Sequence, residues 1–114
     1  MDKASIHRYG DELYTALIER KTVAPLIERE PSITIEDAYK SQQRMVQRRI
    51  DAGERVVGKK IGATSKVVMD MLGVNQPDFG ILLSGMVFNE GETVDTSRLI
   101  APKAEAEVAF VLGR

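Results

Sequence analysis

Residues 55–65 read RVVGKKIGATS, and the chain changes character at this stretch. Its first seven residues are typical of a β-strand, because valine and isoleucine favour extended backbone. The four residues that follow predict a turn into a short helix over residues 66–72, and Gly73 is placed to end that helix. The sequence therefore predicts a strand, a turn and a helix at the centre of the chain.

The part of the chain before this stretch is predicted to be helical. Apolar residues recur at spacings of three and four from Ile6 to Leu17, which indicates one face of an amphipathic helix. A second helix is predicted after Thr34, which stands three residues before Asp37 in the spacing of a capping box. Gly53 is placed to follow the last turn of that helix.

The part after the short helix is predicted to be rich in short strands. Residues 75–80 read NQPDFG, which is turn chemistry throughout, and residues 89–92 predict a hairpin connection. Four strands are predicted, at residues 81–83, 86–88, 93–95 and 104–112. The expected class is α+β, with a helical region over residues 1–54 and a mixed or antiparallel β region over residues 55–114.

Composition excludes several classes of protein. The 114 residues include 16 Lys+Arg and 17 Asp+Glu, and this near balance argues against a nucleic-acid-binding protein. Cysteine is absent and His7 is the only histidine, which excludes disulfide scaffolds, thiolate metal sites and histidine clusters. No run approaches the ~18 apolar residues of a membrane span, and the first residues do not form a signal peptide. Any chemistry must therefore rest on carboxylates and lysines.

The predicted strand at residues 104–112 carries two neighbouring acids. Because strand side chains alternate between faces, Glu105 and Glu107 share one face with Cα atoms about 6.6 Å apart, and the opposite face is apolar. Their repulsion is about 2.5 kcal/mol at an effective dielectric of about 20, so a partly buried pair needs a cation. A divalent ion such as Mg²⁺ or Mn²⁺ suits oxygen ligands. The alternative is a solvated edge strand, and the sequence offers no obvious third carboxylate.

Three other polar groups are candidates for chemistry. Lys59 and Lys60 point to opposite faces of their strand, so one of them is able to face a cleft and polarise an anion. Asp78 is an acid/base candidate on a loop. Ser65 opens the short helix, whose free N–H groups attract anions. The alternatives are two solvated lysines, an ordinary turn residue and a simple helix cap.

Three segments together resemble one enzyme family: GKKIGATS at residues 58–65, MLGVNQPDFG at 71–80 and PKAEAE at 102–107. The sequence resembles the 2-hydroxypenta-2,4-dienoate hydratases, also called 2-keto-4-pentenoate hydratases, of the fumarylacetoacetase-like superfamily. These enzymes act in bacterial meta-cleavage degradation of aromatic compounds. The resemblance covers the whole chain and implies the N-terminal part of an incomplete fumarylacetoacetase-like β-rich fold.

The resemblance also implies roles for particular residues. Glu105 and Glu107 match two of three carboxylate ligands to Mg²⁺ or Mn²⁺, the third being expected beyond residue 114. Lys60 matches an active-site lysine, and Asp78 matches an acidic residue that faces the substrate. Leu72 matches a residue that lines the pocket, and Ser65 is expected to contact the substrate.

The implied activity is that of a hydro-lyase, which adds water to 2-hydroxypenta-2,4-dienoate and forms 4-hydroxy-2-oxopentanoate. The 114 residues alone are expected to be inactive. The resemblance implies a small 2-oxo acid substrate, a cytoplasmic homo-oligomer and an association with the decarboxylase of the same pathway. One alternative is a 4-oxalocrotonate (2-oxo-3-hexenedioate) decarboxylase, against which Asp78 argues. Another is a non-catalytic chain whose last strand is an assembly surface.

Overall fold

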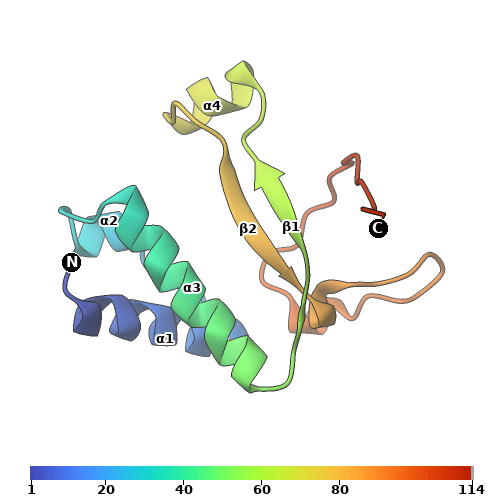
Figure 1. Ribbon diagram of the computed structural model, residues 1–114, viewed down its shortest axis with the longest axis horizontal. Coiled ribbons are helices and arrows are strands. Elements are labelled where there is room, and N and C mark those ends of the chain that lie inside the picture. The colour runs from blue at the N-terminus through green and yellow to red at the C-terminus, as the bar shows by residue number, and fades with distance from the viewer. Residues whose placement is uncertain (114) are drawn as a thin grey trace.

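Two long helices and a two-stranded sheet form the regular part of the computed structural model, which describes residues 1–113 (Figure 1). The helices are α1 (Lys3–Glu19), α2 (Leu26–Arg29), α3 (Ile35–Asp51) and α4 (Lys66–Leu72). The strands are β1 (Val56–Gly62) and β2 (Asp78–Leu83), and two 3₁₀ turns follow, η1 (Ser84–Met86) and η2 (Thr96–Arg98). The expected mixture of helices and strands is confirmed. No helix within residues 1–113 has the length and apolar character that a membrane crossing requires.

The predicted helix starts and ends are confirmed by their capping groups. The Thr34 hydroxyl accepts a hydrogen bond from the Asp37 backbone N–H at 3.1 Å, and the Asp37 carboxylate accepts one from the Thr34 N–H at 3.1 Å. This reciprocal pair satisfies N–H groups that the first turn of α3 leaves free. Gly73 ends α4 in the left-handed conformation, with φ of 69°, which glycine adopts without strain.

Helices α1 and α3 pack closely at Gly10. A Cβ atom added there would lie 2.5 Å from the Arg44 Cβ and 2.7 Å from the Ser41 carbonyl oxygen. Beside this contact, the Asp11 carboxylate accepts hydrogen bonds from Arg44 at 2.8 Å and from Arg48 at 2.9 Å. The missing side chain at position 10 therefore lets the helices approach, and the ion pairs border the contact.

Replacing Gly10 with alanine is expected to lower the free energy of unfolding by about 1–3 kcal/mol, the usual cost of overpacking. Helix propensity alone predicts the opposite sign, because alanine is the better helix former. Urea denaturation followed by circular dichroism measures the change. The control is Ala4→Gly on the exposed side of α1, where propensity alone predicts a loss of at most about 1 kcal/mol. A Gly10→Ala protein as stable as the unmodified one would contradict the close packing.

The Glu54 side chain joins the end of α3 to the end of the sheet. Its carboxylate accepts hydrogen bonds from Arg49, one of them at 2.8 Å, and from the Gly85 backbone N–H at 3.0 Å. The side chains of Arg49 and Glu54 are only 13% and 23% exposed. The Arg49 guanidinium holds the pKa of the Glu54 carboxyl below its usual range, although burial opposes this effect.

This pair predicts a pH dependence of stability. Because the pKa of Glu54 is lowered by folding, its contribution is present above the unfolded-state value near 4.5 and is lost as the pH falls through the folded-state pKa. The stability difference between the unmodified protein and Glu54→Gln is therefore expected to be constant above about pH 5 and to shrink below about pH 4.5. Urea denaturation at a series of pH values measures it, with the exposed Glu19→Gln as the control. A difference that grows as the pH falls would contradict the prediction.

The sheet is an antiparallel pair, and its register decides which side chains share a face. Lys60 lies opposite Gly80, and Gly62 lies opposite Asp78. Directly opposed residues point to the same side of a sheet, so Lys60 and Asp78 share one face. Ile61 lies opposite Phe79, and this pair points to the other face.

Several strand predictions in the second half of the chain are wrong. Residues 81–83 are indeed extended, but β2 already begins at Asp78, inside the predicted turn. The segments 86–88, 93–95 and 104–112 form no strand. The turn predicted at residues 89–92 is present, with a hydrogen bond from the Glu92 N–H to the Asn89 carbonyl at 3.1 Å, but no strands flank it.

The reason for this difference is that a strand needs a partner. Within residues 1–113, β1 and β2 pair only with each other, so the sheet offers no further hydrogen-bonded neighbour. The predicted apolar face of residues 104–112 is also not buried, since Val108 is 82% and Phe110 86% exposed. The C-terminal tail instead runs irregularly along the β1 side of the sheet (Figure 1).

Candidate active site

Four of the six predicted site residues come together around the Lys60 ammonium. The Lys60 Nζ donates a hydrogen bond to Glu107 Oε1 at 2.9 Å. This hydrogen bond raises the pKa of Lys60, burial opposes the rise, and the charges of Glu107, Glu105 and Asp78 add to it. The ammonium is therefore paired with Glu107, and the charges of Glu105 and of Asp78 act on it as well.

This cluster forms although the predicted strand at residues 104–112 does not. Lys60 and Glu107 are 46% and 54% exposed, so their ion pair contributes little to folding stability. Its importance is that it brings the positive charge of Lys60 and the negative charge of Glu107 together beside the sheet. Glu107 is paired with Lys60 and does not extend unpaired into solvent, and the charge of Glu105 also acts on Lys60.

Gly62 explains how the Asp78 carboxylate fits beside β1. A Cβ atom on Gly62 would lie 2.5 Å from Asp78 Oδ1, far inside van der Waals contact. The space that the missing side chain leaves at position 62 is occupied by the Asp78 carboxylate. Glycine at position 62 thus sets where Asp78 lies relative to Lys60.

A cleft of about 1060 Å³ adjoins the cluster. It lies between α3, the loop of residues 73–77 and the sheet, and its lining includes Tyr39, Gln42, Lys60, Asp78, Phe79 and Met86. The ring of Tyr39 stacks on that of Phe79 with centroids 4.8 Å apart and ring planes 9° apart. Local sequence patterns contain no signal of this contact, because the two residues lie 40 positions apart.

Of the six predicted site residues, Lys60 and Asp78 line this cleft, and Glu105, Glu107, Ser65 and Leu72 lie outside its lining. The Ser65 hydroxyl accepts a hydrogen bond from the Val68 N–H at 3.2 Å and so caps α4. Leu72 ends α4 with 57% of its surface exposed. The capping interpretation of Ser65 is thus realised, and substrate contact by either residue stays a prediction.

A metal site is not complete within the described residues. Among residues 1–113, no three histidine, cysteine, aspartate or glutamate side chains are arranged to hold a metal ion. Glu105 and Glu107 remain a pair, and one of them, Glu107, accepts a hydrogen bond from the Lys60 ammonium.

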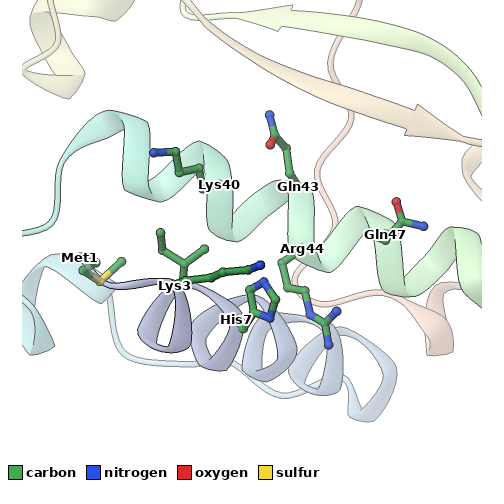
Figure 2. A pocket seen from close by; sticks show the side chains of 8 residues that line it. Met1, Lys3, His7, Lys40, Gln43, Arg44 and Gln47 are labelled. Atoms are coloured by element: carbon green, nitrogen blue, oxygen red, sulfur yellow. The ribbon is translucent and has the colours of Figure 1, made fainter.

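A second, smaller groove of about 550 Å³ lies between α1 and α3 (Figure 2). Lys3 and His7 line it from α1, and Lys40 and Arg44 line it from α3. Lys40 is paired with Glu36 at 2.7 Å, and Arg44 is paired with Asp11. Its cations are therefore largely neutralised by carboxylates of the same two helices, and none of the predicted site residues lies there.

Comparisons with curated proteins find close relatives, whereas no protein-family model matches the chain. The chain is 57% identical over 113 residues to a 2-hydroxypent-2,4-dienoate hydratase of Pseudomonas putida, a match that covers 98% of the chain and 51% of that protein. It is 49% identical over 113 residues to a 2-hydroxyhexa-2,4-dienoate hydratase of Comamonas testosteroni, covering 97% of the chain and 43% of that protein. The chain thus spans about half the length of the curated relatives it matches.

Solved structures show the same fold. The 4-oxalocrotonate decarboxylase from Pseudomonas putida G7, complexed with magnesium and adipate, superposes with a TM-score of 0.84 at 27% identity. The superposition covers 88% of this chain and 38% of the decarboxylase. The decarboxylase is the more distant relation, since the hydratases share up to about twice as many identical residues over nearly the whole chain. Over nearly its whole length, the chain is therefore similar to 2-hydroxypenta-2,4-dienoate hydratases, and more so than to the decarboxylase.

Proposed function

We propose that the intact protein containing these residues is a metal-dependent hydro-lyase of the meta-cleavage catabolism of aromatic compounds. Its substrate is 2-hydroxypenta-2,4-dienoate and its product is 4-hydroxy-2-oxopentanoate. The observation that carries the proposal is the cluster of Lys60, Asp78, Glu105 and Glu107, which gathers on one face of the sheet the charged residues on which the family resemblance rests. The names of the relatives at 57% and 49% identity support the same reaction.

We propose that Glu105 and Glu107 hold Mg²⁺ or Mn²⁺ in the intact protein. Carboxylate oxygens suit these ions, and the ammonium beside Glu107 indicates that this pair needs positive charge. The magnesium in the related decarboxylase supports the choice of ion. The third carboxylate is assigned to the part of the relatives that this chain does not match. When bound, the ion supplies Lewis-acid polarisation of the substrate's 2-oxo group.

We assign the proton transfers of the reaction to residues of this chain. In the balanced reaction the enol proton ends at C5, the hydroxyl group of water joins C4 and the remaining proton of water joins C3. The Lys60 Nζ retains its proton, because its neighbours raise its pKa, and it is suited to donate a hydrogen bond to the oxygen that gains negative charge. Asp78 shares that face and is suited to orient the water or relay its proton.

The proposal is tested by incubating the intact protein with 2-hydroxypenta-2,4-dienoate in H₂¹⁸O, with Mg²⁺ or with a chelator. We expect loss of the dienoate absorbance, one ¹⁸O atom at C4 of the product, and strong loss of the reaction in the chelator. The second candidate is decarboxylation of 2-oxo-3-hexenedioate, which the structural similarity to the decarboxylase favours. Release of CO₂ from that substrate at a higher kcat/KM than hydration would overturn the hydratase assignment.

The organisation of the intact protein follows the same reasoning. We propose a helical region over residues 1–54 and the start of the β-rich catalytic domain over residues 55–114, a division supported by the separate packing of α1 on α3 and of β1 on β2. We also propose a cytoplasmic homo-oligomer that associates with the decarboxylase of its pathway. The exposed apolar side chains of Val108 and Phe110 support a protein-binding role for the tail. Sedimentation of the intact protein, alone and with the decarboxylase, tests both associations.

A further inference from the structure

Tyr39 of α3 contacts β2 directly beside the candidate site. Its hydroxyl accepts a hydrogen bond from the Phe79 backbone N–H at 3.3 Å, and its ring stacks on the Phe79 ring. In Figure 1, β2 lies between α3 and β1, and the Phe79 N–H is directed to Tyr39 of α3 and not to β1. Within the described chain, the Tyr39 hydroxyl satisfies a backbone donor that the two-stranded sheet cannot.

The contact fixes one residue by both its backbone and its side chain. Asp78 precedes Phe79, and successive side chains of a strand point to opposite faces. Holding Phe79 against α3 therefore directs the Asp78 carboxylate to the face that carries Lys60. Gly62 adjoins the same carboxylate from β1, since a Cβ atom there would lie 2.5 Å from Oδ1. Asp78 is thus constrained by α3 through Phe79 and by β1 through Gly62.

We infer that Tyr39 is a positioning residue of the active site, acting through Phe79 to hold the Asp78 carboxylate beside Lys60. The inference rests on the proposed hydratase function, and it deepens that function by assigning a role to the helical region. It makes α3 part of the catalytic geometry, although no α3 carboxylate or lysine reaches the Lys60 cluster in the described residues.

The decisive variant is Tyr39→Phe, which keeps the stacked ring and removes only the hydroxyl. Three quantities are measured in the intact protein: the hydrogen-exchange rate of the Phe79 amide, the ¹³Cγ chemical shift of Asp78, and kcat and KM separately. Loss of one hydrogen bond predicts about 3- to 10-fold faster exchange of the Phe79 amide. We expect kcat to fall by about 10-fold with little change in KM, because small displacements of a catalytic group are costly.

The matched control is Tyr14→Phe on α1, whose ring lies beneath the Arg48 guanidinium, 4.5 Å from it. It is expected to leave all three quantities unchanged. Phe79→Leu removes the stacked ring while keeping an apolar side chain, and it should shift the Asp78 signal and kcat in the same direction as Tyr39→Phe. If Tyr39→Phe lowers stability but leaves the Asp78 shift and kcat as they were, the contact is only structural and the inference is overturned.

The two proposals fail in different ways. An unmodified protein that does not hydrate the dienoate removes the proposed function and leaves the exchange and chemical-shift results to decide on Tyr39. A protein that hydrates the dienoate while Tyr39→Phe leaves the Phe79 exchange rate and the Asp78 shift unchanged overturns the role of Tyr39 alone.

Discussion

Replacing Lys60 with alanine is expected to lower the kcat of the intact protein by about 10²- to 10⁴-fold, the usual contribution of a positioned proton donor. The reason is the placement of its ammonium, which donates a hydrogen bond to Glu107 at 2.9 Å and lies on the same face of the sheet as the Asp78 side chain. Steady-state hydration of 2-hydroxypenta-2,4-dienoate measures the effect. Lys60→Arg keeps the positive charge and is expected to recover part of the lost rate.

Lys59 provides the matched control for this prediction. It carries the same charge on the same strand, but it lies opposite Ile81 and therefore points to the other face of the sheet. Lys59→Ala is expected to leave kcat within about twofold, since surface substitutions away from such sites have small effects. Equal losses in both variants would point to the stability of β1 rather than to chemistry, and unchanged turnover in Lys60→Ala would remove Lys60 from the mechanism.

Local signals explain why the helices α3 and α4 and the strand β1 were predictable. The capping box of Thr34 and Asp37 involves residues three apart, and the stop of α4 at Gly73 depends on one residue's backbone conformation. Strand β1 was equally predictable, because its β-branched residues are flanked by residues that favour turns. Such features depend on neighbours within a few positions, and sequence spacing is enough to specify them.

Long-range contacts explain where the sequence failed. Residues 104–112 have the alternation of a strand, but alternation specifies a strand only if another strand supplies hydrogen bonds. The Tyr39–Phe79 contact and the space that Gly62 leaves for Asp78 could not be predicted for the same reason. Each depends on how segments far apart in the sequence pack against each other. The site chemistry was nevertheless predictable in part, because Lys60, Asp78, Glu105 and Glu107 were identified by residue type and family resemblance before their placement was known.

Replacing either Glu105 or Glu107 with glutamine is expected to weaken the binding of Mn²⁺ to the intact protein by at least about 10-fold. The change keeps the size of the side chain but removes the negative charge that a divalent ion requires, and even outer-sphere substitutions at metal sites cost about 10–100-fold. Calorimetric titration with Mn²⁺ measures the affinity. Glu90→Gln is the control. Glu90 is an exposed acid in the turn at residues 89–92 and is not one of the proposed metal ligands.

Comparison of the two substitutions distinguishes a role in metal binding from a role in the ion pair with Lys60. Glu107 accepts the Lys60 hydrogen bond, whereas Glu105 influences Lys60 only through its charge. If the acids serve as ligands, both substitutions weaken Mn²⁺ binding by comparable factors. If Glu107 serves only to hold Lys60, Glu107→Gln lowers turnover while Mn²⁺ affinity stays at the unmodified value in both variants. That second pattern would leave the protein without the two ligands assigned here, and the metal-dependent mechanism would then have to be abandoned for this site.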